Sequence, residues 1–168
     1  KELGEPSHAT ALDYLINKYD WSKSQEQVTG QQETINIYAG TNENVELSNF
    51  AIRPFNYKDF RYNSVEQAFQ HQKLRTSAPH SGASNHLNDE IEGKILTSKT
   101  GAEAKVLGKQ IKNLNVIAWD RISSSVMKEL LLESFQQNPD ALQKLLSTGN
   151  AILTHTQDKS KWGTEFPR

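Results

Sequence analysis

The chain has 168 residues, of which 35% are hydrophobic and none is cysteine. This length predicts one domain with at most a small appendage, and the lack of cysteine excludes disulfides, thiolate-bound metals and thiol nucleophiles. The 19 basic and 20 acidic residues give a net charge of -1, so no global basic field points to nucleic acid. No apolar run approaches the roughly 18 residues of a membrane span. We therefore expect a cytoplasmic protein without a membrane partner, and a chain that starts at Lys1 is expected to be a processed product or part of a longer one.

The first 33 residues are expected to lie outside the main domain. Four apolar residues within 7–21 recur at the i, i+3, i+4 and i+7 positions of a helix face, namely Leu12, Leu15, Ile16 and Tyr19. Residues 22–34 are rich in Ser, Gln, Glu and Thr, which is typical of a linker or loop. We expect residues 1–33 to form a helix and a polar linker, and 34–168 to form the main domain. The helix either docks onto this domain or belongs to a region upstream.

A strand, a hairpin and a helix follow at the start of the main domain. Apolar and polar residues alternate over 34–38, which predicts a short strand. The segments 51–57 and 60–62 flank a Lys-Asp turn and predict a hairpin. The hairpin leads directly into a helix expected over 64–73.

Helices separated by loops dominate the rest of the chain. Residues 77–89 contain proline, glycine and several serines, which indicates a loop. Apolar spacing and stop signals predict helices over 90–98, 102–112, 123–137 and 139–148. Residues 151–156 read as a buried strand and 157–168 as a terminal loop. The predicted class is α+β: a helix-rich single domain with a few short strands.

The helix at 64–73 carries a polar stripe. Glu66, Gln70 and Lys73 fall at i, i+4 and i+7, so a carboxylate, an amide and an ammonium share one face. Burial of the flanking Phe69 and Leu74 would place this stripe at the rim of a pocket. The spacing of these residues leaves Glu66 open to two roles, a group that caps the helix or a group that faces a substrate.

Two capping boxes compete at the start of this helix. Asn63 pairs by spacing with Glu66, and Ser64 pairs with Gln67. If Ser64 is the N-cap, Gln67 takes the box position and Glu66 is left free in the first turn, where the helix dipole favours its ionised form.

Metal and phosphate motifs are weak in this chain. His80 and His86 fall in the predicted loop at 77–89, but no carboxylate or third histidine follows at ligand spacing. We therefore expect no metal site. No glycine-rich phosphate loop of the Walker or Rossmann type is present in the sequence.

Several short motifs occur together in an order that resembles the NADAR family, also called YbiA-like. They are Leu-Ser-Asn-Phe at 47–50, Pro-Phe at 54–55, Tyr-x-Ser-Val-Glu-Gln-Ala-Phe-Gln-x-Gln-Lys at 62–73, Leu-Gly-Lys at 107–109, Trp119, Met127 with Leu130, Phe-Gln-Gln-Asn-Pro at 135–139, Leu-Leu-Ser-Thr-Gly at 145–149, and Asp158 with Trp162-Gly163. The resemblance covers roughly residues 35–163. It implies the YbiA-like fold over the main domain.

The resemblance also implies an N-glycosidase, a hydrolase that needs no cofactor. The bond cleaved would join ribose C1 to nitrogen in an ADP-ribosylated compound, for example a guanine base of a nucleotide or DNA, or in a phosphoribosylated compound. The substrate partner would thus be an ADP-ribose-type or ribose-phosphate small molecule, or an ADP-ribosylated nucleic acid. A non-catalytic module that binds ADP-ribose or an NAD derivative within a larger protein is the main alternative, and a purely structural domain is a third. The oligomeric state stays open.

The site residues implied by the resemblance are two carboxylates and a set of binding groups. Glu66 is the first catalytic candidate and Asp158 the second, although the Asp-to-Trp interval is one residue longer than in some relatives. The expected substrate-binding residues are Ser48, Asn49, Phe50, Arg61, Gln70, Lys73, Trp119 and Trp162. Each has an ordinary structural alternative: a turn for the Ser-Asn pair, core packing for Trp119, and a solvated surface charge for Arg61. Arg53 and Lys109 are weaker phosphate candidates, also expected as surface charges.

Overall fold

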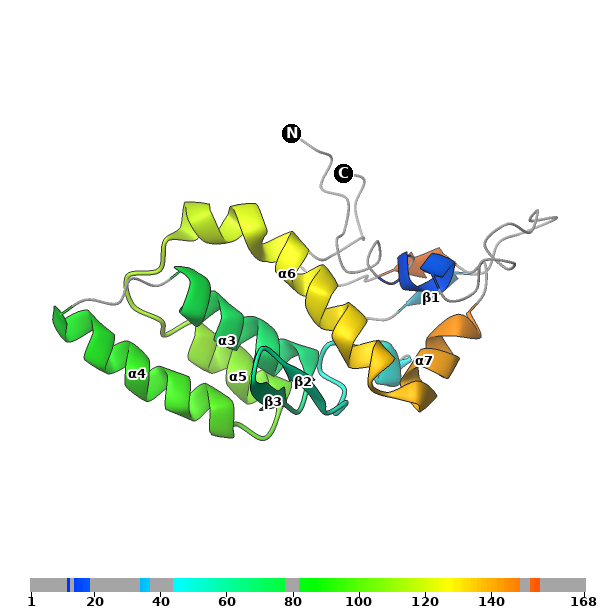
Figure 1. Cartoon of the computed structure of the whole chain (residues 1–168), viewed down its shortest axis with the longest axis horizontal. Helices are drawn as coiled ribbons and strands as arrows, with labels where there is room; N and C mark the ends of the chain where they lie inside the picture. The colour runs from blue at the N-terminus through cyan, green and yellow to red at the C-terminus, as the bar shows by residue number, and fades with distance from the viewer. Residues whose placement is uncertain are drawn as a thin grey trace. The chain divides into compact units, whose positions relative to one another are not determined.

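The computed structural model describes residues 12, 14–18, 34–36, 44–77, 82–148 and 152–154. The chain divides into two compact units, one formed by Asn49–Gln137 and the other by Lys1–Ser48 together with Asn138–Arg168 (Figure 1). The expected division into 1–33 and 34–168 stays a prediction. Helices predominate in the described ranges and the strands are short, so the predicted α+β class is confirmed.

Helix α3 is central to the unit of Asn49–Gln137. The unit begins with the hairpin strands β2 (Phe55–Tyr57) and β3 (Phe60–Tyr62) and continues with the helices α3 (Val65–Ser77), α4 (Gly82–Thr97), α5 (Gly101–Gly108) and α6 (Val116–Gln136). Helix α3 contacts all three of the other helices, as Figure 1 shows. Each face of α3 is therefore covered by a different neighbour, which explains its many buried polar side chains.

An apolar cluster holds α3, α4 and α5 together. Leu74, Ile91 and Ile95 form its buried centre, and the partly buried Leu107 and Ile111 pack against it. Three helices can share one small cluster because each contributes residues from a single face. Leu74 is the residue of α3 in this cluster, so other residues of α3 remain for other contacts with α5 and α6.

The hairpin has the tight turn that the sequence predicts. Phe55 pairs with Tyr62 and Tyr57 with Phe60 in an antiparallel register. The two turn residues, Lys58 and Asp59, have positive φ angles of 48° and 71°. Two positive φ values in a two-residue loop are typical of a type I′ turn, whose twist matches that of the strands.

Polar contacts fix the hairpin to α6. The backbone N–H and C=O of Asn56 bond to the side-chain amide of Gln137, at 2.8 and 2.9 Å. The Tyr57 hydroxyl donates to Glu129. Arg53, only 4% exposed, donates from Nε to Ser134 Oγ at 2.9 Å. The expectation that Arg53 is a solvated surface charge is therefore wrong, because its guanidinium is sequestered against α6.

The other unit is formed by both ends of the chain, and it contains two further short strands and helical segments. Strand β1 (Thr34–Asn36) pairs in parallel with β4 (Ile152–Thr154). A short 3-10 helix, η2 (Val45–Leu47), contacts α7 (Pro139–Leu146). Near the N-terminus, residues 14–18 are helical, as predicted. The predicted strands at 34–38 and 151–156 are confirmed only in their central three residues, and the rest lies outside the described residues.

Three predicted boundaries are wrong. Residues 82–89 were expected in a loop, but they form the first half of α4, where the buried Asn88 side chain bonds to the backbone N–H and C=O of Lys112. Helix α6 begins at Val116, not near residue 123, because the Asn115 side chain caps it by accepting the Ala118 N–H at 3.0 Å. The start of α4 was missed because the composition of residues 82–89 is typical of a loop. The start of α6 was missed because its first apolar residues, Val116 and Ile117, are exposed and do not follow a buried helical stripe. Helix α5 also ends earlier than expected, at Gly108.

Among the helices that the structure describes, none combines the length and apolar character that crossing a bilayer requires.

Candidate functional site

The first turn of α3 uses the second of the two possible capping boxes. Ser64 Oγ accepts the N–H of Gln67 at 3.1 Å, and Gln67 Oε1 accepts the N–H of Asn63 at 2.6 Å. Glu66 takes no part in this box. Its carboxylate therefore does not close this box. It lies in the first turn of α3, at the positive end of the helix dipole.

Glu66 is a buried carboxylate with a defined orientation. Its side chain is 7% exposed, and Oε2 accepts a hydrogen bond from Gln70 Nε2 at 2.6 Å. Its backbone N–H donates to the carbonyl oxygen of Asn49 at 3.0 Å. The loop before the hairpin thus satisfies one of the free N–H groups of α3 and brings Asn49 against the residue that carries the carboxylate.

Helix α5 approaches the Glu66 face of α3 at two glycines. A Cβ atom at Gly101 would lie 2.7 Å from Phe50 Cδ1 and 3.1 Å from Glu66 Cβ. A Cβ atom at Gly108 would lie 1.8 Å from Gln70 Oε1. A side chain at either position would require a neighbouring side chain or helix to shift, so the backbone of α5 packs closely beside Glu66 and Gln70.

Three lysines, Lys73, Lys105 and Lys109, lie near Glu66 or Phe50. Burial lowers the pKa of Lys73; the nearby Glu66 carboxylate raises it, and the charge of Lys109 lowers it. The exposed Lys105 lies with Nζ 5.8 Å from the centre of the Phe50 ring. One carboxylate and several ammonium groups therefore share a small region, an arrangement suited to a ligand that carries negative charge at one end.

Asn49 contributes an acceptor in a buried setting. Its side chain is 7% exposed, and Nδ2 contacts Met127 Sδ at 3.7 Å. Its Oδ1 accepts no hydrogen bond from the residues that the structure describes. A buried acceptor without a partner costs free energy, about 1–3 kcal/mol, and such a group is often satisfied by a ligand or a water.

Aromatic side chains pack between α3 and α6. Trp119, in the first turns of α6, is 7% exposed, and its ring centre lies 5.0 Å from that of Phe69. Trp119 therefore belongs to the packed interior between α3 and α6. Its stacking on a substrate stays a prediction.

The other predicted site residues are Arg61, Ser48, Asp158 and Trp162. Arg61 is exposed on β3, and its guanidinium donates to Asn56 at 3.3 Å. Strand alternation directs Arg61 away from the face that carries Tyr62. Ser48 is buried and belongs to the other unit. Asp158 and Trp162 lie outside the described residues.

Sequence reasoning missed the two glycines of α5. A signal was present, because Gly101, Ala104 and Gly108 recur at helical spacing and all three are buried. A face of small residues on a short helix indicates close approach to a neighbour. The neighbour and its side chains become known only from the packing.

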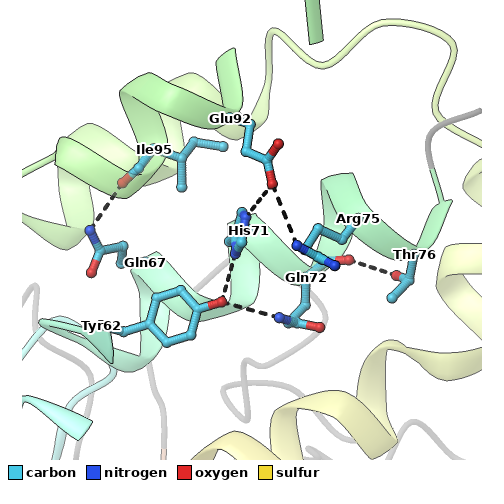
Figure 2. Close-up of polar contacts among 8 residues, drawn as sticks. All are labelled: Tyr62, Gln67, His71, Gln72, Arg75, Thr76, Glu92 and Ile95. Atoms are coloured by element: carbon cyan, nitrogen blue, oxygen red, sulfur yellow. Dashed lines mark hydrogen bonds and ion pairs between the residues drawn. The ribbon is translucent and has the colours of Figure 1, made fainter. Parts of the chain in front are cut away.

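A second polar network lies on the α4 side of α3 (Figure 2). His71 is fully buried, with Nδ1 2.6 Å from the Tyr62 hydroxyl and Nε2 2.7 Å from Glu92 Oε2. Gln72 Nε2 donates to the same hydroxyl at 3.2 Å, so the hydroxyl donates to Nδ1 and the Nε2–H donates to Glu92. Burial lowers the pKa of His71, against the opposing effect of Glu92. The network joins β3, α3 and α4.

A cavity of about 600 Å³ lies between the end of α4 and the outer face of α5. Its lining includes Thr97, Thr100 and Val106, and none of the predicted site residues. The hydroxyl groups of Thr97 and Thr100 already bond within their own helices. In the described ranges, no group of three or more His, Cys, Asp or Glu side chains is arranged to hold a metal ion.

Comparison with known proteins identifies the family of this chain. The NADAR domain family model matches residues 20–168. An N-glycosidase of Acanthamoeba polyphaga mimivirus is 32% identical over 71 residues, which are 42% of this chain and 42% of the relative. The N-glycosidase YbiA of Shigella flexneri serotype 5b (strain 8401) is 25% identical over 134 residues, 79% of this chain and 76% of the relative. YbiA of Escherichia coli (strain K12) is 24% identical over the same length.

The chain belongs to the NADAR family, because the family match spans most of its length. The expected family is thereby confirmed, and the relatives support the expected enzyme class, a hydrolase of the N-glycosidase type.

Proposed function

We propose that this protein hydrolyses the bond between ribose C1 and a base nitrogen, with Glu66 as the catalytic carboxylate. The observation that carries the proposal is the state of Glu66: buried, excluded from the capping box, and held by Gln70 at 2.6 Å. A module that only binds a ribose derivative has no need for an oriented carboxylate.

The chemistry of the bond gives this carboxylate two uses. Cleavage of an N-glycosidic bond builds positive charge on the sugar ring in an oxocarbenium-like transition state. A fixed carboxylate beside C1 stabilises that charge and can accept a proton from the attacking water. The position of Glu66 in the first turn of α3 favours its ionised form, which both uses require.

The lysines support a substrate with phosphate attached to the ribose. The Glu66 carboxylate raises the pKa of Lys73 and the charge of Lys109 lowers it, so these three charges lie near one another. In the proposed complex, the ammonium groups bind phosphate oxygens while the carboxylate faces C1. Asn49 Oδ1, which lacks a partner among the described residues, would accept a hydrogen bond from a ribose hydroxyl or a base edge.

The substrate class is an ADP-ribosylated or a phosphoribosylated base. ADP-ribosylated guanine, free or in DNA, is one form within this class. Asp158 as the second carboxylate, Trp162 as a stacking residue and a cytoplasmic location remain parts of the proposal.

Mass spectrometry of the products tests the proposal. The protein is incubated with ADP-ribosylated guanosine DNA and, separately, with a phosphoribosyl-pyrimidine. We expect release of ADP-ribose or ribose phosphate from one of them. Glu66→Gln should reduce the rate by a factor of about 100 or more. The control Glu90→Gln, which changes an exposed glutamate on α4, should keep the wild-type rate.

Two results would contradict the assignment. Equal rates for wild type and Glu66→Gln would remove Glu66 from the mechanism. Binding of ADP-ribose by the wild type without product from either substrate would favour a binding module over a hydrolase.

A further inference from the structure

Gly108 in α5 lies directly against the side chain that orients Glu66. A Cβ atom built at Gly108 would fall 1.8 Å from Gln70 Oε1, 2.6 Å from Cδ and 3.2 Å from Cγ. Atoms at the first two distances cannot coexist without a shift of the side chain or of the helix. Gln70 is 6% exposed, so a shift of its side chain would have to take place within the packed interior.

A glycine in another helix, Gly93, makes no such close approach to a neighbouring side chain. A Cβ atom at Gly93, in α4, would meet nothing within 4 Å. Replacement of a helix glycine by alanine normally stabilises, because alanine loses less conformational freedom on folding. Gly93 follows that expectation, whereas Gly108 has a steric reason to be glycine.

The direction of the Gln70 amide follows from its partner. Nε2 donates to Glu66 Oε2 at 2.6 Å, since an oxygen in that place would face another oxygen acceptor. Oε1 consequently points toward Gly108, where it accepts no hydrogen bond from the described residues. The reverse amide orientation is thus disfavoured by Glu66, and a side chain at position 108 would displace the present one.

We propose that Gly108 is a positioning residue of the site: by lacking a side chain, it keeps the Gln70 amide against α5 with its N–H donor on Glu66. The orientation of the Glu66 carboxylate is then set by the contact between α3 and α5. The catalytic consequence of this inference rests on the proposed function, but the steric coupling does not.

A double-mutant cycle in urea unfolding tests the steric coupling without any substrate. We expect Gly108→Ala to lower the unfolding midpoint of the full chain, while Gly93→Ala leaves it unchanged or raises it. In a Gln70→Ala background the obstacle is gone, so Gly108→Ala should lose its destabilising effect. An equal effect of Gly108→Ala in both backgrounds, or none in the wild type, overturns the proposal.

Kinetics test the consequence for Glu66. Gln70→Met keeps the length of the side chain but removes the donor, and it requires no extra space at Gly108. We expect both Gln70→Met and Gly108→Ala to lower kcat/KM about tenfold to a hundredfold, the effect of losing one hydrogen bond to a charged group. Gly93→Ala should retain the wild-type value.

The pH profile separates positioning from general loss of structure. A donor on the carboxylate favours its ionised form, so its loss should move the acidic limb of the kcat/KM profile to higher pH. An unmoved limb in Gln70→Met overturns the positioning role. If the wild type hydrolyses neither substrate, the proposed function fails while the unfolding cycle still decides the steric coupling.

Discussion

The side-chain amide of Gln67, in the first turn of α3, donates to the carbonyl oxygen of Ile95, in the last turns of α4, at 3.0 Å. The same Nε2 lies 3.2 Å from the carbonyl oxygen of Ser98, and Oε1 accepts the N–H of Asn63 at 2.6 Å. One buried amide thus satisfies backbone groups at the start of one helix and at the end of another. Because Gln67 closes the capping box, this box does not involve the neighbouring Glu66.

Gln67→Met should destabilise the protein by about 2–3 kcal/mol, because it leaves buried backbone donors and acceptors without partners. The exposed Gln110 offers a matched control, for which Gln110→Met should change the free energy of unfolding by less than about 0.5 kcal/mol. Urea unfolding followed by circular dichroism measures both values. Similar midpoints for the two variants would show that the Gln67 bridge contributes little.

The buried His71 should make stability depend on pH. Burial lowers its pKa below the ordinary value of 6.5, so the unfolded chain binds a proton more readily than the folded protein. Stability is then fully present above about pH 6.5 and falls as the pH decreases from there toward the folded-state pKa. The slope for one group is at most about 1.4 kcal/mol per pH unit.

Comparison of histidine variants isolates this contribution from that of the carboxylates. His71→Gln should flatten the fall in unfolding free energy between pH 7 and 5, whereas the exposed His86→Gln should retain it. The groups that face His71 are Tyr62 on β3, Arg75 on α3 and Glu92 on α4. Identical pH slopes for wild type and His71→Gln would contradict the assignment.

Arg53 should not tolerate replacement by lysine. Its guanidinium bonds to Ser134 at 2.9 Å and lies 4.3 Å from the centre of the Phe135 ring. A lysine cannot reproduce the planar group, so Arg53→Lys should destabilise by about 1–3 kcal/mol. The same exchange at the exposed Arg121 should be neutral in the same urea titration. A neutral Arg53→Lys would mean that charge alone suffices at this position.

The turn residue Asp59 should be improved by glycine. Its φ of 71° lies in the left-handed region, which glycine adopts without steric cost. We expect Asp59→Gly to raise the free energy of unfolding by about 0.5–1 kcal/mol. The same substitution at Asp89, an exposed residue within α4, should lower it by roughly 0.5 kcal/mol, because glycine weakens a helix. Thermal unfolding of the two variants should therefore shift in opposite directions.

Local signals in the sequence predicted the elements whose causes are local. The hairpin turn at Lys58 and Asp59 depends on turn chemistry, and the helix start at Asn138-Pro139 depends on a proline in the first helical turn. The start of α4 at Gly82 could not be predicted in the same way. A polar segment that looks like a loop is held in a helix by Asn88, whose partner Lys112 lies 24 positions away.

The sequence by itself determined the polar stripe of Glu66, Gln70 and Lys73, because helical periodicity places them on one face. It also restricted the capping box to two alternatives. Only the tertiary structure decided between them, and only it placed the glycines of α5 against the stripe. The reason is physical: a hydrogen bond such as that between Gln67 and Ile95, or a steric contact such as that between Gly108 and Gln70, joins residues on separate helices. Neither contact exists until these helices pack.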